Sequence, residues 1–503
     1  MIAGGEAGGR GRKPAGLHEG RDARGVRAPR PVLAAAVAFL ALGSAAPAQA
    51  QGTRALVGGT IVDGTGADPV ENGVVLVDGD RITCVGTRGT CPVPQSAEPI
   101  DVSGRYVTPG LVDAHVHFSQ TGWVDGRPDG LSAPDVYPYA ETAAAAEANP
   151  DRWHQSYLCS GITAVYDPGG HPWTTDLPRA AEGRGDRAHV RAAGPRVTFA
   201  RVPALNLDDE VYTFLPMSSD EEALASVARL AEMGSTSVKV WYLRVPEGQR
   251  EEMDARLMRV GAQARTAGLD LIVHATDLRG AKVALRAGAA MLVHSVEDRL
   301  VDDEFLELAR AADVVYAPTL RVGRHWARAI ISVVLDAPAT LDDPNGCVDP
   351  VTVRNIQATG ALRPYLQDRL QGNVDYALDR MRRVGTTEAV MAENLRRVRD
   401  AGIVIATATD AGNPLTLHGP SIYEEMEAMQ DAGVPAAEVV VLSTRNGARA
   451  MGRLEDFGTL EAGKLADLLV LEEDPTQDVR AFRSLSHVMR AGVLHEQEAL
   501  RYR

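Results

Sequence analysis

The sequence has few cysteines, and none of them forms a metal-binding pair. The 503 residues include only Cys84, Cys91, Cys159 and Cys347, and no two of these are separated by just two residues. A zinc site built from Cys-x-x-Cys thiolates is therefore not expected. If the protein is exported, Cys84 and Cys91 can form a disulfide across a hairpin, and two buried free thiols are the equal alternative.

Basic residues are also in short supply. The chain has 52 Lys and Arg against 67 Asp and Glu, a net charge of −15. The first fifty residues carry seven basic and three acidic side chains, a charge of +4, which leaves −19 for the remainder. A chain this acidic repels phosphate backbones, so nucleic acid is not expected as a partner. Solubility is the simplest reason for the charge.

Long apolar runs are absent after the first fifty residues, so no stable membrane span is expected. Residues 31–42 are apolar but too few to span a bilayer as a stable helix, and they lead to the small-x-small pattern Ala48-Gln49-Ala50. This predicts a signal peptide over residues 1–50, cleaved after Ala50, and an exported protein that is periplasmic or secreted. No cysteine follows the cut, so lipid anchoring there is not expected.

The organisation of the remaining chain changes twice. Residues 53–109 contain short strand-like runs and an Asp-Gly turn, which is typical of a small β unit. Residues 110–455 alternate between strand-like and helical patterns. Residues 456–496 return to strand-like runs, which we expect to pair with the first unit. The two chain ends would then form one discontinuous, composite β-sandwich domain.

Eight strand-like runs alternate with helices in the central part and predict an α/β fold, a (β/α)8 TIM barrel. A long segment, residues 320–400, separates the last two runs. An excursion of this length after a strand is usually a lid or an element facing the substrate. The eight runs are residues 111–118, 162–167, 190–199, 237–242, 270–275, 291–295, 314–319 and 403–410.

Metal-capable and base-capable side chains lie at the ends of several of these runs. His115 and His117 are two residues apart, so in a strand they point to the same face. Two neutral imidazoles can form half of a metal site, although a pair of ordinary strand histidines is the equal alternative. The ends of barrel strands meet at one rim, which would bring further candidates to the pair. These are Lys239, His274, His294 and Asp410.

Three stretches of the sequence resemble the amidohydrolase superfamily. They are residues 109–117 (Pro-Gly-Leu-Val-Asp-Ala-His-Val-His), residues 408–412 (Ala-Thr-Asp-Ala-Gly) and residues 458–468. The resemblance covers residues 53–493 and is closest to the branch with imidazolonepropionase-like enzymes and bacterial Xaa-Pro and Xaa-Arg dipeptidases. It implies a metal-dependent hydrolase on a (β/α)8 barrel with a composite β-sandwich.

The resemblance also implies two divalent metal ions, expected to be zinc. The more buried ion would be held by His115, His117 and Asp410, and the more exposed ion by His274 and His294. Lys239, as N6-carboxylysine, would bridge the two ions. A hydroxide held between them would be the nucleophile, and Asp410 would act as general base and then as general acid. Superfamily members with one metal lack the bridging lysine, so Lys239 favours two.

Three more residues are candidates for substrate contact. Tyr242 lies three residues after Lys239 and could donate a hydrogen bond to a substrate carbonyl. His418 follows the eighth strand-like run, and His171 lies in the loop after the second. Both histidines are explained equally well as ordinary loop residues.

The expected function is hydrolysis of a C–N (amide) bond in a small molecule, namely a dipeptide, an N-acyl amino acid or a cyclic amide. The same site could open lactones or phosphotriesters, because an activated water attacks any suitably polarised centre. A non-catalytic binding barrel is disfavoured because all six ligand positions are filled, and Lys239 disfavours a deaminase with one metal. The sequence leaves the substrate, the metal identity and a homo-oligomer open.

Overall fold

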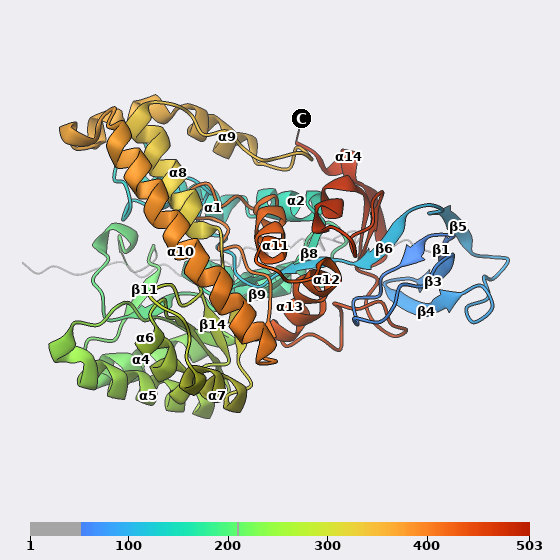
Figure 1. Ribbon diagram of the computed structural model, residues 1–503, viewed down its shortest axis with the longest axis horizontal. Coiled ribbons are helices and arrows are strands. Elements are labelled where there is room, and N and C mark those ends of the chain that lie inside the picture. The colour runs from blue at the N-terminus through green and yellow to red at the C-terminus, as the bar shows by residue number, and fades with distance from the viewer. Residues whose placement is uncertain (1–51, 209–210, 503) are drawn as a thin grey trace, which may run out of the picture. The chain divides into compact units, whose positions relative to one another are not determined.

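The computed structural model describes residues 52–208 and 211–502. The predicted signal peptide over residues 1–50 lies outside the described residues and stays a prediction. The described part contains parallel strands with helices between them, and antiparallel strands from both ends of the chain (Figure 1). It is therefore a mixed α/β protein.

The parallel strands form two sheets. One has the order β11-β10-β12-β13-β14-β15-β16 and the other β7-β8-β9. Every hydrogen-bonded neighbour pair in both sheets is parallel. The strands are β7 Leu111–Asp113, β8 Ile162–Asp167, β9 His189–Ala192, β10 Arg196–Thr198, β11 Phe214–Pro216, β12 Ser237–Trp241, β13 Asp270–His274, β14 Met291–Val293, β15 Val315–Ala317 and β16 Val404–Ile405.

Three of the predicted strands differ from the observed ones by more than two residues. The run predicted over residues 111–118 is a strand only at β7, so His115 and His117 lie in the loop after it and not in a strand. The run predicted over residues 190–199 is divided into β9 and β10, because Gly194 adopts a φ of 68° and Pro195 follows it. The run predicted over residues 403–410 is a strand only at β16. Asp410 has a φ of 66°, which a continuing strand cannot accommodate.

The two parallel sheets are linked just beyond β7 and β16. The amide of Ala114 donates to the carbonyl of Thr407 (3.0 Å), and the amide of Asp410 donates to the carbonyl of His115 (2.8 Å). A parallel bridge also joins Val116 to Ala411. No continuous strand ladder closes the barrel among the described residues. The two loops are nevertheless held together by backbone hydrogen bonds.

Helices lie between the parallel strands, and side chains fix where several of them begin. Ser219, Asp277 and Asp302 each accept a hydrogen bond from a backbone N–H at the start of α4, α6 and α7. The helices are α1 Tyr139–Ala148, α2 Asp151–Cys159, α3 Leu177–Ala181, α4 Asp220–Glu232, α5 Arg250–Thr266, α6 Leu278–Arg286, α7 Asp303–Ala311, α8 Val322–Leu335, α9 Pro350–Gln357, α10 Val374–Asp400, α11 Ser421–Asp431, α12 Ala436–Ser443, α13 Arg445–Ala450 and α14 Gln497–Leu500.

The remaining strands form two sheets, ordered β4-β3-β1-β5 and β19-β18-β17-β6-β2. The second sheet joins the two chain ends, because β6 pairs antiparallel with β17, with Pro109 opposite Leu468. Leu56, Val75 and Met489 belong to a core shared by both sheets. The domain limits at residues 109, 455 and 496 stay predictions. The strands are β1 Arg54–Val57, β2 Thr60–Ile61, β3 Gly73–Asp78, β4 Arg81–Thr87, β5 Glu98–Asp101, β6 Tyr106–Pro109, β17 Leu468–Leu471, β18 Leu485–Arg490 and β19 Val493–Glu496.

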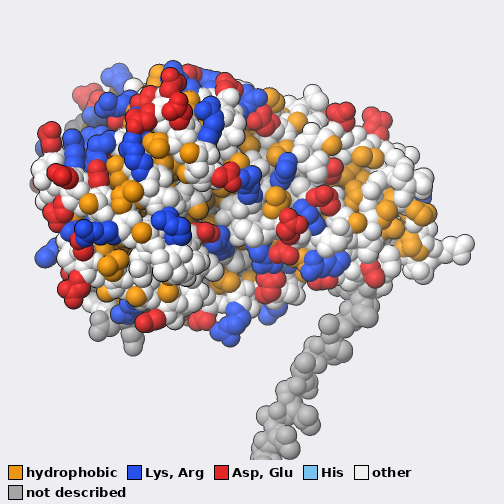
Figure 2. Space-filling view, turned by 90° about the horizontal axis from the view of Figure 1, so that it is seen from below, with side chains coloured by type: hydrophobic (Ala, Val, Ile, Leu, Met, Phe, Trp, Pro, Cys, Tyr) orange, Lys and Arg blue, Asp and Glu red, His pale blue; other side chains and the backbone are white. Residues whose placement is uncertain are grey.

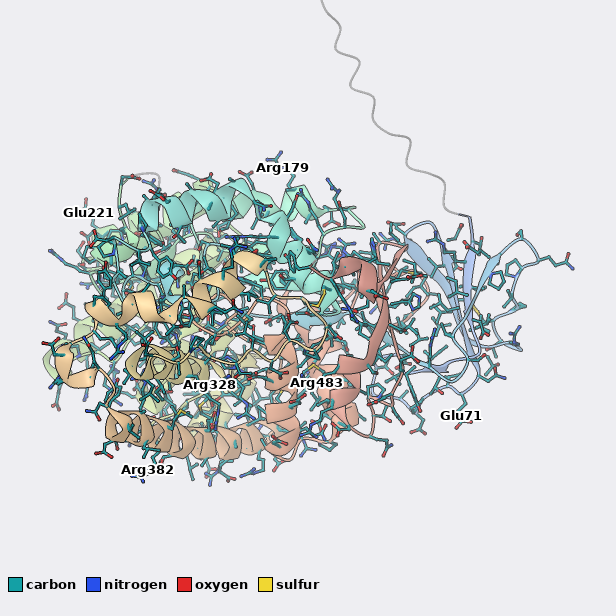
Figure 3. All side chains as sticks on the ribbon, turned by 90° about the horizontal axis from the view of Figure 1, so that it is seen from above. Glu71, Arg179, Glu221, Arg328, Arg382 and Arg483 are labelled. Atoms are coloured by element: carbon teal, nitrogen blue, oxygen red, sulfur yellow. A yellow bond between two sulfur atoms is a disulfide. The ribbon has the colours of Figure 1, made fainter. Side chains whose placement is uncertain are left out.

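The predicted insertion between β15 and β16 contains α8, α9 and α10, and α8 runs alongside α10 (Figure 1). Its middle part is tied to the rest of the chain. Cys347 forms a disulfide with Cys159 at the end of α2. Arg483, labelled in Figure 3, pairs with Asp342 of the insertion at 2.6 Å. The insertion is therefore anchored at a point distant in sequence from both of its ends.

The second disulfide joins Cys84 of β4 to Cys91 in the loop that follows, so the structure has this bond and not the two free thiols. It does not cross a hairpin as expected, because Cys91 lies in no strand and the hairpin partner of β4 is β3. The Cys159–Cys347 bond has no counterpart among the sequence expectations, because the two residues are 188 positions apart.

The surface in Figure 2 carries basic and acidic side chains in alternation, with small hydrophobic areas between them. Among the described residues, no helix has both the length and the apolar character needed to cross a membrane.

The two disulfides should differ in their effect on stability. They close loops with sequence separations of 188 and 7 residues. In the chain-entropy model the longer loop confers about 3 kcal/mol more stabilisation. We expect the double variant Cys159→Ser/Cys347→Ser to lose much more free energy of unfolding than the matched control Cys84→Ser/Cys91→Ser, as measured by denaturant titration. Equal losses would contradict the anchoring role of the longer loop.

Candidate metal centre

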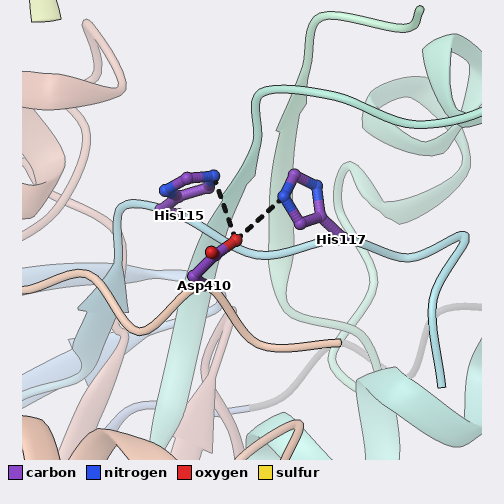
Figure 4. Close-up of side chains that lie close together, drawn as sticks. All are labelled: His115, His117 and Asp410. Carbon is purple, nitrogen blue, oxygen red and sulfur yellow. Dashed lines mark ion pairs between the residues drawn. The ribbon is translucent and has the colours of Figure 1, made fainter. Parts of the chain in front are cut away.

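Three buried side chains meet where the chain leaves β7 and β16 (Figure 4). The Oδ1 atom of Asp410 lies 3.4 Å from Nε2 of His115 and 3.0 Å from Nε2 of His117. One candidate ligand atom from each residue lies within 4.8 Å of the others. Both ring nitrogens of His115 are buried without a hydrogen-bond partner among the described residues. Buried polar atoms are normally satisfied, so this donor set fits a metal ion.

Two more histidines extend this cluster. His274 is the last residue of β13, and His294 follows β14. Their ring centroids are 4.3 Å apart, and the ring of His294 is 5.2 Å from that of His115. The hydroxyl of Thr319 hydrogen-bonds Nδ1 of His294 at 2.7 Å. This contact fixes the ring and leaves Nε2 as the atom available to a ligand.

Lys239 lies in β12 and lines the same cavity as these residues. Its side chain is 2 % exposed. The pKa of Lys239 is lowered to about 7, chiefly by burial and also by the charge of Arg196. A substantial fraction of the amine is therefore neutral at neutral pH. Only the neutral amine can react with carbon dioxide to give a carbamate, so the environment suits the predicted N6-carboxylysine.

Protonation at the cluster also suits a divalent cation. Burial, together with the charge of Lys239, holds the pKa values of His115 and His274 well below the usual range. Burial and His274 do the same for His294. Burial alone would raise the pKa of Asp410, but the hydrogen bond from His117 and the charge of His294 lower it overall. Neutral imidazoles beside an ionised carboxylate are the donors that zinc and similar ions take.

The carboxylate of Asp113 braces the two loops that carry the cluster. It accepts hydrogen bonds from the amide of Thr409 (3.0 Å), the hydroxyl of Thr409 (2.6 Å) and the amide of His115 (3.2 Å). A second buried carboxylate, that of Asp167, lies 3.5 Å from Nδ1 of His117. Carboxylates in this position hold a ligating histidine in one orientation.

Backbone strain is concentrated at the same place. His294, Thr319 and Asp410 have φ angles of 70°, 48° and 66°. Such conformations cost about 1–3 kcal/mol each for side chains other than glycine, and they persist only where the surroundings enforce them. Beyond Thr319, Glu425 of α11 accepts hydrogen bonds from the amides of Leu320 (2.7 Å) and Arg321 (3.1 Å). These contacts hold the strained turn in place.

All six predicted ligands line one cavity of about 400 Å³. Trp241 and Phe214 form part of its wall, together with Arg127 and Arg196. The insertion provides the opposite wall through α8 and α10, so it faces the candidate site as expected. Its lining residues include Arg324, Trp326, Arg380, Arg383, Glu388 and Met391.

The three residues predicted to contact substrate do not line this cavity. The hydroxyl of Tyr242 donates to Asp254. His418 bonds the hydroxyl of Tyr157 (2.7 Å) and a backbone carbonyl (3.0 Å) through its two ring nitrogens. His171 is bonded in the same way to a tyrosine hydroxyl (3.2 Å) and a backbone carbonyl (3.1 Å). The polar atoms of these three side chains have hydrogen-bond partners within the protein. These partners are brought to them by the packing of segments that are distant in sequence.

The reasoning from sequence did not find several residues that shape the site. Asp113 is the one that sequence reasoning could have found most easily, since it lies two residues before His115 in the motif. Asp167 ends β8, so the rule that strand ends carry function could have found it. Thr319 ends the run predicted over residues 314–319, so the same rule could have found it, whereas Arg127 and Arg196 carry no local signal in the sequence.

Comparisons of the sequence and of the structure with known proteins agree on the family and on the fold. Residues 106–494 match the model of the Amidohydrolase family. An imidazolonepropionase from Caulobacter vibrioides is 24 % identical, with 80 % of this chain and 88 % of that protein covered. A 5-methylthioadenosine/S-adenosylhomocysteine deaminase from Symbiobacterium thermophilum is 25 % identical, with 85 % and 88 % covered. A solved Xaa-Pro dipeptidase with bound methionine has the same fold, with a TM-score of 0.65 at 20 % identity over 88 % of this chain and all of that one.

Removing the Thr319 hydroxyl should weaken metal binding. Thr319→Val keeps the size of the side chain but removes the bond that orients His294. Outer partners of this kind usually contribute about 10–100-fold to metal affinity. We expect a loss of that size, measured by competition with a metal-binding dye. Thr319→Ser should retain the affinity, and Thr266→Val, on the exposed face of α5, is the matched control. Unchanged affinity in Thr319→Val would rule out the orienting role.

Proposed function

Because the chain belongs to the amidohydrolase family, we propose that it is a metal-dependent hydrolase that cleaves the amide C–N bond of a small molecule. The substrate classes are a dipeptide, an N-acyl amino acid or a cyclic amide. The observation that carries the proposal is the convergence of all six candidate ligands on one cavity. The relatives named as a deaminase and a dipeptidase support chemistry at a C–N bond.

The proposed centre holds two divalent ions, with zinc as the expected metal. One ion would be held by His115, His117 and Asp410. The second would be held by His274 and His294, and Lys239 as N6-carboxylysine would lie between them. When bound, such ions polarise a carbonyl and lower the pKa of water.

The protein groups would then control protons, orientation and access to water. Asp410 is held as a carboxylate on the cavity wall, so it would accept the proton of the attacking water and deliver it to the leaving nitrogen. The brace from Asp113 keeps this carboxylate in place. The walls from α8 and α10 shield the reaction from bulk water, and the cavity is of the size that small ligands occupy.

Three other activities remain alternatives on the same site. Lactone and phosphotriester hydrolysis need the same activated water and differ only in the shape of the cavity. Deamination of a free small molecule is supported by one relative, but the buried Lys239 favours a centre with two ions. A panel with one substrate of each class separates these activities.

We also propose three features of organisation. The two parallel sheets would act as one (β/α)8 barrel, joined through the loops after β7 and β16. The two sheets built from the chain ends, which are mostly antiparallel, would form one composite β-sandwich. The protein would be exported, and the two disulfides favour this because such bonds persist in oxidising compartments.

Metal content and activity test the proposal together. We expect about two metal ions per chain by elemental mass spectrometry, since the site offers two sets of ligands. The number should fall in Lys239→Ala, and a chelator should abolish hydrolysis of amide substrates. About one ion in both proteins would contradict the bridging role of Lys239, and full activity in a metal-free protein would contradict the proposed function.

The role of Asp410 is tested by the variant Asp410→Asn. Loss of a general base or acid typically costs about 10²–10⁴-fold in rate, so kcat should fall by that factor. Asp68→Asn, an exposed change in the β domain, is the matched control and should keep the parent kcat. A kcat within about threefold of the parent in Asp410→Asn would exclude the proton transfer.

A further inference from the structure

We propose that Arg196 binds a carboxylate of the substrate beside the metal centre. This inference rests on the proposed function and narrows the substrate to amides with a free carboxylate near the scissile bond. Dipeptides and N-acyl α-amino acids have this chemistry, whereas neutral amides, lactones and phosphotriesters lack it.

The guanidinium of Arg196 is buried and has no ion pair among the described residues. The residue is 7 % exposed, and its Nε and Nη2 atoms are buried without a hydrogen-bond partner among the described residues. No carboxylate in the described part of the chain lies within 4.0 Å of it. Buried charges are normally paired, because an unpaired one is costly to keep out of water. A ligand is therefore the missing partner.

Strand register places Arg196 next to the proposed metal bridge. In the parallel pair β10–β12, Val197 lies opposite Val240, so Arg196 lies beside Lys239. Val197 and Val240 face the hydrophobic core, so the alternation along a strand directs Arg196 and Lys239 to the opposite face. Both residues line the cavity. Arg196 and Lys239 therefore extend from neighbouring strands into the same cavity.

Packing holds the guanidinium in one position. Its central carbon lies 4.8 Å from the ring centroid of Phe214, and the ring of Phe214 stacks on Trp241 at 5.0 Å. On the other side Gly169 leaves the room that the side chain needs, because a Cβ at Gly169 would lie 2.5 Å from Cδ of Arg196. An arginine held in this way loses little freedom on binding a carboxylate. The two rings also give the substrate an apolar wall.

The other cationic groups of the cavity do not offer the same site. Arg380, on α10, is partly exposed, and its Nη1 donates to the hydroxyl of Tyr376. The remaining three arginines each pair with a carboxylate: Arg127 with Asp129, Arg324 with Glu388, and Arg383 with Asp379. The Nε atom of Arg380 is also buried without a hydrogen-bond partner among the described residues, but the residue as a whole is less buried than Arg196. Arg196 is thus the buried cavity arginine with no carboxylate within 4.0 Å among the described residues, and Asp167, Asp410 and Asp129 act on its charge from farther away.

The first test compares an acid with its neutral counterpart. The metal-loaded protein is assayed with N-acetyl-L-phenylalanine and with the corresponding C-terminal amide. Losing one side of a buried charge pair typically costs about 30-fold or more, so kcat/KM should be higher for the acid by at least that factor. Equal values in the parent protein would overturn the proposal without any variant.

The second test uses Arg196→Met, which keeps the length of the side chain and removes its charge. The preference for the acid should disappear, chiefly through KM, and Arg196→Lys should restore part of it. Arg179→Met is the matched control, since Arg179 is exposed on α3 (Figure 3). A preference that survives in Arg196→Met would also overturn the proposal while leaving the hydrolase function intact.

A binding measurement separates the two proposals if no amide is hydrolysed. Calorimetry with 3-phenylpropionate and with 3-phenylpropanol needs no turnover. The carboxylate should bind at least about 30-fold more tightly to the parent than to Arg196→Met, and the alcohol should bind both equally. A difference in binding without hydrolysis would reject the proposed function and support the carboxylate site. Equal binding of the carboxylate to both proteins would reject the site.

Discussion

The candidate site depends on the join between the loop after β7 and the loop after β16. One loop carries His115 and His117, and the other carries Asp410. Neither strand is long enough to align these side chains, so the alignment comes from hydrogen bonds between the loops and from the buried carboxylate of Asp113. Two hydrogen bonds from Thr409 to this carboxylate hold together segments almost 300 residues apart, and a third, from the amide of His115, fixes the carboxylate within its own loop. Among the described residues, no continuous strand ladder contributes to this join.

Much of the fold was accessible from the sequence because the signals were local. Periodicity predicted the alternation of strands and helices over residues 110–455, which the structure has, with α4, α5 and α7 among the helices. The rule that functional residues gather at strand ends brought His274, His294 and Lys239 to the same cavity as the His115–His117 pair. Motif spacing and strand order were sufficient for these residues.

The remaining features depend on contacts that have no local pattern. Arg196 resembles any strand arginine until the register with β12 and the absence of a nearby carboxylate are known. His418 resembled a substrate contact because it follows the last parallel strand, yet its ring stacks on Trp153 at 4.0 Å and both nitrogens are bonded. The sequence also gives no sign that Cys159 pairs with Cys347, because the two residues are 188 positions apart. Proximity in space decides each of these cases.

The turn from Thr319 to Arg321 belongs to two parts of the molecule. Its first residue orients His294, while the next two are held by Glu425 and lead directly into α8 of the insertion. The insertion is therefore not an independent module that recombination can exchange at the end of β15. If the insertion is replaced by that of a relative, the orientation of His294 is retained only if the junction lies after Arg321. Divergence of the insertion can then change the cavity through α8 and α10, while the root of the insertion is inherited together with the candidate metal centre.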